Sequence, residues 1–154
     1  MKYIIFLIFF ISSLLSQELK IKANNFSADE KIGLSVFEGD VSILKGLDEL
    51  NASKVSVYTD KKHHPTKFIA DGNVSFTITT KKGSKYQGKA GKVIYIPQKK
   101  EYLFLKDVHL EQIDERKEII GDEVVLKTIE GIAYAKGVKK EPVIIIFKLP
   151  EENE

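Results

Sequence analysis

The chain has 154 residues, which suits one domain, and it contains 24 basic residues, 22 acidic residues and no Cys. The lack of Cys excludes disulfides and thiol chemistry. The near balance of charge argues against a protein that binds nucleic acid through bulk charge. If an N-terminal leader were removed together with Lys2, 23 basic residues would remain against 22 acidic ones.

The first element along the chain is an apolar segment that begins MKYIIFLIFF and ends at Leu15. Its apolar block is shorter than the roughly 20 residues that a bilayer-spanning helix needs. A single Lys before the block and a small residue, Ser16, after it are typical of a secretory signal peptide. We therefore predict that residues 1–16 are a signal peptide and that the protein is exported to a bacterial periplasm, where structural disulfides are optional. An uncleaved anchor and a buried strand stay open as alternatives.

Residues 17–149 are predicted to form one all-β domain, followed by a disordered tail, residues 150–154. Runs of alternating apolar and polar residues are separated by polar turns such as TDKKHHPTK and TKKGSK, and no long amphipathic helix is indicated. The first strand region is LKIKANNF, residues 19–26, and the last is PVIIIFKL, residues 142–149.

Between these regions one strand pattern recurs as FEGDVSIL, FIADGNVSFTIT and LFLKDVHLEQ. The copies align on valines that are 33 and 34 residues apart, with a weaker copy 30 residues later: Val41, Val74, Val108 and Val138. A second series of valines alternates with the first, so that each unit is a pair of strands: Val55, Val93 and Val124. Such a unit cannot bury its apolar face alone, whereas stacked units form one apolar surface. Because the repeats advance in one direction, the first and last strand regions are predicted to lie at opposite ends of the sheet.

The copy from Phe68 to Thr79 shows one apolar and one polar face. Its even positions are apolar apart from Gly72, whereas its odd positions are polar except for Ile69. Alternate residues of a strand point to opposite faces, so one side of this sheet is predicted to be apolar. A Gly inside a strand marks a bend or bulge, and its recurrence at Gly39 indicates a curved, twisted sheet.

No motif for catalysis or metal binding is present. His63 and His64 are adjacent in a predicted turn and would diverge on an extended chain, which makes them a poor pair of metal ligands. His109 alternates with apolar neighbours and is predicted to lie on the polar side. The sequence contains no nucleophile motif, phosphate loop or metal-ligand spacing, so we predict neither an enzyme nor a cofactor.

Pairs of lysines mark many of the predicted turns: Lys61–Lys62, Lys81–Lys82, Lys99–Lys100 and Lys139–Lys140. Such pairs favour solubility and protect the margins of a sheet. They would equally suit contact with the phosphates of a lipid headgroup. The sequence leaves both interpretations open.

The order and spacing of several stretches resemble the OstA-like, or LptA, family of periplasmic lipopolysaccharide-transport proteins. They are SADEKIGLSVFEGDVSILKG, LNASKVSVYTD, FIADGNVSF and KAGKVIYIPQKKEYLFLKDVHLEQIDERKEIIGDEVVLKT, and the resemblance spans about residues 25–137. In the third copy Lys106 and Asp107 stand where the family pattern has Gly and Asn, which leaves the bend there open.

The resemblance implies a twisted, partly open antiparallel β-jelly-roll and a non-enzymatic carrier that holds the acyl chains of lipopolysaccharide in a slot. The implied partners are an inner-membrane anchor protein, an outer-membrane translocon and further copies joined end to end. A membrane-anchored or scaffold module of the same fold is the alternative. From the residue pattern alone, the apolar face would equally be a closed core.

The side chains expected to line the slot occupy the apolar positions of the repeated strands. They are Val41, Ile43, Val55, Val57, Phe68, Val74, Phe76, Ile78, Val93, Tyr95, Phe104, Val108, Leu110, Val124 and Leu126. The run VIIIF in the last strand region lacks alternation, so either both faces of that strand, or one face and an edge, need cover. We predict that it pairs with a strand of another copy or of a transport component.

Overall fold

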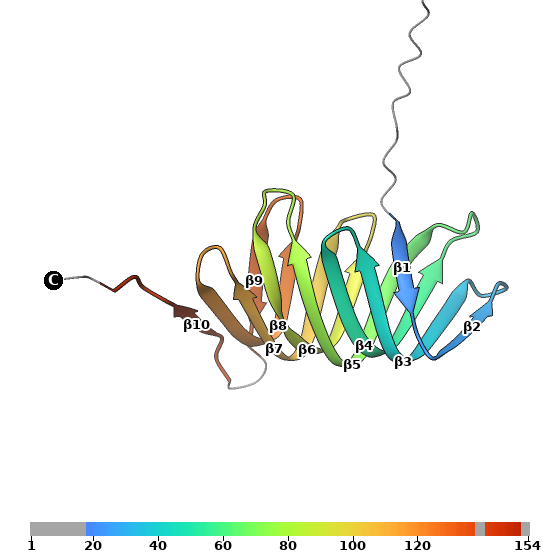
Figure 1. Ribbon diagram of the computed structural model, residues 1–154, viewed down its shortest axis with the longest axis horizontal. Helices are drawn as coiled ribbons and strands as arrows, with labels where there is room; N and C mark the ends of the chain where they lie inside the picture. The colour runs from blue at the N-terminus through green and yellow to red at the C-terminus, as the bar shows by residue number, and fades with distance from the viewer. Residues whose placement is uncertain (1–17, 138–140, 152–154) are drawn as a thin grey trace, which may run out of the picture.

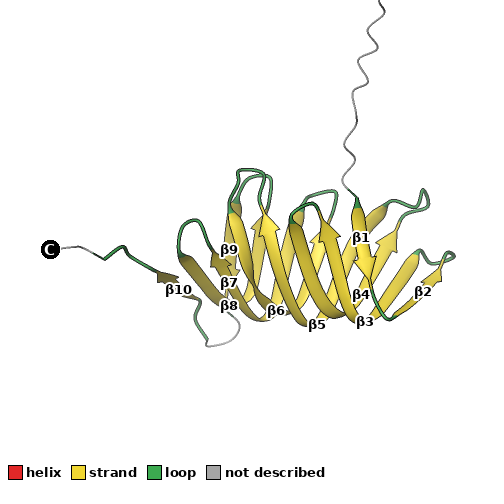
Figure 2. Ribbon diagram, in the orientation of Figure 1, coloured by secondary structure: helices red, strands yellow, loops and turns green. Residues whose placement is uncertain are grey.

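A computed structural model describes residues 18–137 and 141–151, and these contain ten β-strands (Figures 1 and 2). Their bounds are β1 Leu19–Lys22, β2 Asn25–Asp29, β3 Leu34–Lys45, β4 Asp48–Thr59, β5 Pro65–Thr79, β6 Lys85–Ile96, β7 Glu101–Gln112, β8 Lys117–Lys127, β9 Ile132–Lys136 and β10 Ile144–Phe147. The predicted all-β class is therefore confirmed. No helix capable of crossing a membrane occurs in these ranges.

All ten strands belong to one antiparallel sheet. Its order is β1-β3-β4-β5-β6-β7-β8-β10, with β2 also paired to β3 and β9 also paired to β8. From β3 to β8 each strand therefore lies beside its neighbours in sequence. The first and last strands lie at opposite ends of this row, as predicted (Figure 1).

The long strands bend in the middle and divide the sheet into two wings. The ladder slips between Glu38 and Val41 in β3, and equivalent slips occur in β5 and β7. The first wing contains residues 34–38, 54–59, 65–71, 92–96, 101–105 and 123–127 together with β2 and β9. The second wing contains residues 41–45, 48–52, 74–79, 85–90, 108–112 and 117–121 together with β1 and β10. Figure 1 shows the strands curving along one side of the molecule while turns line the other.

Left-handed backbone conformations produce the bends. Gly72 has φ +84° and is followed by Asn73 with φ +45°, and a Cβ atom at Gly72 would lie 2.8 Å from the Ser53 Oγ. Glycine adopts this conformation without steric cost, and Asn and Asp tolerate it better than most residues. In the third copy Lys106 and Asp107 also have positive φ, +66° and +48°. The bend is therefore present there as well, without a glycine.

The inner faces of the two wings pack against each other to form the core. The repeat valines Val41, Val74 and Val108 follow the bends directly and are 0–1% exposed. Across the interior, the ring of Phe76 from the second wing lies 4.4 Å, centroid to centroid, from that of Phe104 in the first. The predicted two-faced strand is confirmed, since Phe76 and Ile78 are buried while Thr77 faces the other side. The weaker copy at Val138 lies outside the described residues.

Candidate functional site

An apolar cleft opens between the two wings near the end that carries β1. Its volume is about 210 Å³. Residues from both wings line it. Nine are apolar or aromatic and three are charged: Leu19, Ile43, Leu50, Pro65, Phe68, Ile78, Tyr95, Pro97 and Tyr102, and Lys45, Asp48 and Glu49. The cleft is therefore a gap between the two wings of the sheet rather than a hollow in one surface.

A row of aromatic rings forms the first-wing wall of this cleft. Phe68 lies 6.1 Å from Tyr95, which stacks on Tyr102 at 4.4 Å, and Tyr102 lies 5.9 Å from Phe104. The row leads from the mouth of the cleft to the closed core. Large, stiff rings supply much apolar area with little loss of side-chain freedom. This wall therefore suits an extended apolar ligand better than a compact polar one.

Asp48 is a half-buried carboxyl group at the lip of the cleft. Burial raises the pKa of Asp48, against the opposing effects of a hydrogen bond from the Thr79 backbone N–H, 2.8 Å, and of the nearby Lys45 ammonium. The Lys45 Nζ lies 5.7 Å from the centre of the Tyr95 ring. Burial also raises the pKa of Tyr102, so its hydroxyl stays protonated and can donate a hydrogen bond.

The replacement Asp48→Asn should make the fold more stable at neutral pH. A raised pKa means that the folded state binds the proton more tightly, so ionisation of Asp48 costs stability as pH rises from the usual 3.8 through the raised value. Asn can still accept the hydrogen bond from Thr79. In urea titrations the variant should match the parent at the lowest pH at which both fold and exceed it at pH 7. The opposite result would be a difference in unfolding free energy, variant minus parent, that falls from acid pH to pH 7. It would contradict this sign.

Farther along the sheet from the cleft, a hydrogen bond between turns of the two wings closes the space between them. The Lys81 backbone N–H in the β5–β6 turn donates to the Thr128 carbonyl in the β8–β9 turn, 2.9 Å. Thr128 in turn donates from its N–H, 3.2 Å, and from its Oγ1, 2.7 Å, to the Lys100 carbonyl. Strands β5 and β8 are not neighbours in the sheet, so the first of these bonds joins one wing to the other. We call these three residues the clasp.

The predicted lining residues all share the inner face, but they divide into two groups. Four of them line the open cleft: Ile43, Phe68, Ile78 and Tyr95. The other eleven are buried in the closed core: Val41, Val55, Val57, Val74, Phe76, Val93, Phe104, Val108, Leu110, Val124 and Leu126. Sequence reasoning missed Leu19, Leu50, Pro65, Pro97 and Tyr102. The only signal for them was the placement of prolines and apolar residues next to turns, where the wings part.

A second opening lies between the wings at the other end of the molecule, beside β10. Its volume is about 670 Å³, and Tyr86, Ile119, Ile145 and Phe147 form part of its wall. Gln112 is buried there; its Nε2 donates to the Ser84 Oγ, 3.4 Å, while its Oε1 has no partner among the described residues. Both ends of the interior therefore carry an opening.

The histidines do not form a site in the described part of the chain. His63 and His64 lie in an exposed turn, and His109 is exposed on the outer face beside Glu118. No group of three or more His, Asp or Glu side chains in residues 18–137 and 141–151 could hold a metal ion.

Comparison with known proteins places this geometry among lipopolysaccharide-transport domains. A family model described as LptA/(LptD N-terminal domain) LPS transport protein matches residues 20–132. Among solved structures, the crystal structure of LptH from Pseudomonas aeruginosa, described as the LptA-homologous periplasmic component of the conserved lipopolysaccharide transport device, superposes with a TM-score of 0.75. The match covers 86% of this chain and 96% of that chain, at 17% identity. A search of curated protein sequences gave no significant match.

Proposed function

The chain belongs to the LptA/LptD N-terminal domain family of lipopolysaccharide-transport proteins, and from this premise we propose that it is a non-enzymatic periplasmic carrier of lipopolysaccharide. It would hold acyl chains between its wings and pass them from the inner to the outer membrane. Residues 1–16 would act as the signal peptide that exports it, and residues 17–149 would form the carrier domain.

The observation that carries this proposal is the apolar cleft that opens into the core between the two wings. Exposure of an acyl chain to water costs about 0.8 kcal/mol per CH₂ group. The walls around Ile43, Phe68 and Tyr95 offer mostly apolar surface, and three of the lining residues are charged. The buried lining residues, such as Phe76, would become accessible if the wings separated beyond the clasp. Binding along the core would therefore require opening, whereas binding in the cleft would not.

The two ends of the sheet support the proposed partners. Among the described strands, β1 and β2 each pair on one side only, with β3, and at the other end β9 and β10 each pair on one side only, with β8. Unpaired strand edges are templates for strands of another chain. We propose that β10 pairs with another copy or with a component of the transport complex, such as the inner-membrane anchor or the outer-membrane translocon.

Site-specific photocrosslinking tests where the lipid lies. A crosslinking residue at Phe68, in the wall of the cleft, should capture lipopolysaccharide in the periplasm, whereas one at Ile69, on the opposite face of β5, should not. A third at Phe76 should label only if the wings open. Equal labelling at positions 68 and 69 would contradict an inner-face site, and labelling at neither, with no lipid co-purifying with the protein, would contradict the carrier.

A further inference from the structure

A polar hollow adjoins the apolar cleft at the mouth between the wings. Its volume is about 440 Å³, and it shares Lys45, Asp48, Tyr95 and Tyr102 with the cleft. The remaining residues that line it include two further lysines and three threonines: Leu47, Thr79, Thr80, Lys81, Lys100, Thr128 and Ile129. An apolar compartment is therefore continuous with one that is rich in cations and hydroxyl groups.

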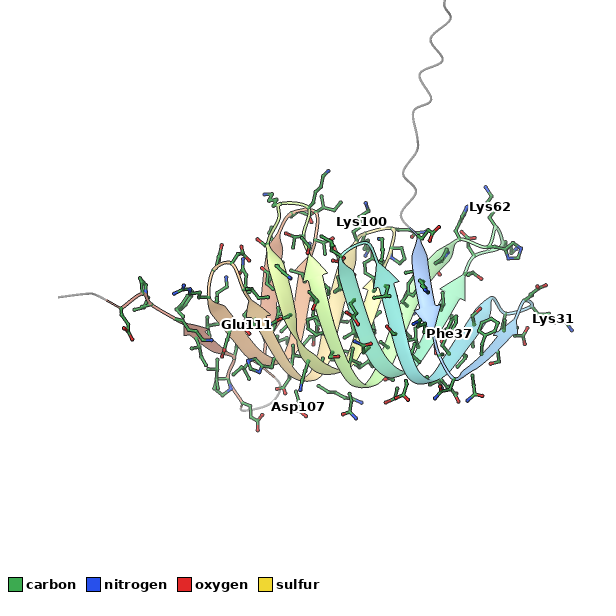
Figure 3. The ribbon with its side chains drawn as sticks, in the orientation of Figure 1. Lys31, Phe37, Lys62, Lys100, Asp107 and Glu111 are labelled. Atoms are coloured by element: carbon green, nitrogen blue, oxygen red, sulfur yellow. The ribbon has the colours of Figure 1, made fainter. Side chains whose placement is uncertain are left out.

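The hollow carries a surplus of positive charge. Three ammonium groups, those of Lys45, Lys81 and Lys100, face one carboxylate, that of Asp48. Neither Lys81 nor Lys100, which lies among the turns (Figure 3), forms an ion pair with a carboxylate in the described residues. By contrast, Lys92 and Lys127 on the strands pair with Asp71 and Glu101. The two turn lysines thus remain available to an anion from outside the chain.

The clasp fixes the backbone under these two lysines. The Lys81 N–H donates to the carbonyl of Thr128, which itself donates twice to the carbonyl of Lys100. Lys81 from the second wing and Lys100 from the first are thereby held on either side of Thr128. The neighbouring members of the same lysine pairs are placed differently, since Lys82 lines the second opening near Gly131 and Lys99 does not line the hollow.

We infer that this hollow binds the phosphate of a lipid whose acyl chain occupies the adjoining cleft. The inference rests on the proposed carrier function and assigns the headgroup end of the same ligand. Ammonium groups form charge-assisted hydrogen bonds with phosphate oxygens, and protonated hydroxyl groups add neutral ones. Lys81 and Lys100 are the principal phosphate contacts, and Tyr102 donates a hydrogen bond from its hydroxyl to the phosphate. Lys45 is placed at the boundary between the lipid headgroup and the acyl chain.

The test compares the variant Lys81→Gln/Lys100→Gln with the control Lys82→Gln/Lys99→Gln. Both remove two positive charges from the same two turns, and all four lysines are exposed, so both variants should melt at the temperature of the parent. The probes are lipid A with two phosphates, the same lipid A after removal of both phosphates, and inorganic phosphate. Binding is measured by native mass spectrometry in dilute detergent.

The parent and the control should bind phosphorylated lipid A with similar affinity, whereas Lys81→Gln/Lys100→Gln should bind it about tenfold or more weakly. All three proteins should bind the dephosphorylated lipid equally well. Equal losses in both variants, or no loss in either, would overturn the headgroup site while leaving the carrier intact. Lys-dependent binding of inorganic phosphate without any preference for phosphorylated lipid would also overturn it. A parent that binds neither lipid would overturn the carrier itself.

Discussion

The replacement Phe104→Ala should lower the free energy of unfolding by about 3–5 kcal/mol. Phe104 is fully buried between the wings, and its ring contacts those of Phe76 and Tyr102. Truncation removes the apolar area of the ring and leaves a cavity that the strands on either side, held by their ladders, can fill only in part. Urea titration followed by circular dichroism measures the loss.

Phe26→Ala is the matched control, because it removes the same ring from an exposed edge. Phe26 is 63% exposed on β2, and the centre of its ring lies 5.0 Å from that of Phe37. We expect this variant to lose about 1 kcal/mol or less. If the interior were an open slot along its whole length, Phe104 would already face solvent, and the two losses would be similar. A loss near that of Phe26→Ala would therefore contradict the closed core.

The replacement Ile145→Pro should weaken the proposed end-to-end association while leaving the domain folded. The Lys148 N–H donates to the Arg116 carbonyl, 2.9 Å, in the same register that sets Ile146 opposite Glu118 and Ile145 opposite Ile119. Hydrogen-bonded pairs alternate along an antiparallel ladder, so the Ile146 N–H faces β8 and the Ile145 N–H faces the free edge. Pro is tolerated in an edge strand where its missing N–H points outward.

Sedimentation velocity over a range of concentrations measures the association. Ile145→Pro should weaken it by about tenfold or more, because an incoming strand loses a ladder bond and meets the proline ring. Ile146→Pro removes a bond to β8 instead, so it should detach β10 and lower stability as well as association. Unchanged oligomers in Ile145→Pro would show that β10 is not the joint. Global unfolding of that variant would show that the strand is part of the core.

The fold was largely predictable because the repeat encodes it locally. The spacing of Val41, Val74 and Val108 predicted paired strands that advance in one direction, and these valines occupy equivalent buried positions after each bend. The bend at Lys106 and Asp107 was not predictable from a glycine, because there two residues with side chains adopt the left-handed backbone conformation.

The cleft was predictable only in outline. Alternation tells which side of a strand is apolar, and it correctly put Phe68 and Phe76 on the same side. It does not tell where the two halves of a bent sheet touch and where they part. The cross-wing bond from Lys81 to Thr128 joins residues that are far apart in sequence, and no local pattern specifies it. The placement of Lys81 and Lys100 around one polar hollow therefore emerged only from the structure.

The simple order of β3 to β8 also determines how long the molecule is. Adjacent strands in a sheet lie about 4.8 Å apart, so each pair of strands contributes about 10 Å to the row. A chain with one more repeat of this kind would gain that increment while keeping the same pairing rule, since each strand from β4 to β7 pairs with its two neighbours in sequence. The distance that such a protein can bridge is therefore set in steps, and gene duplication of a single strand pair is enough to change it.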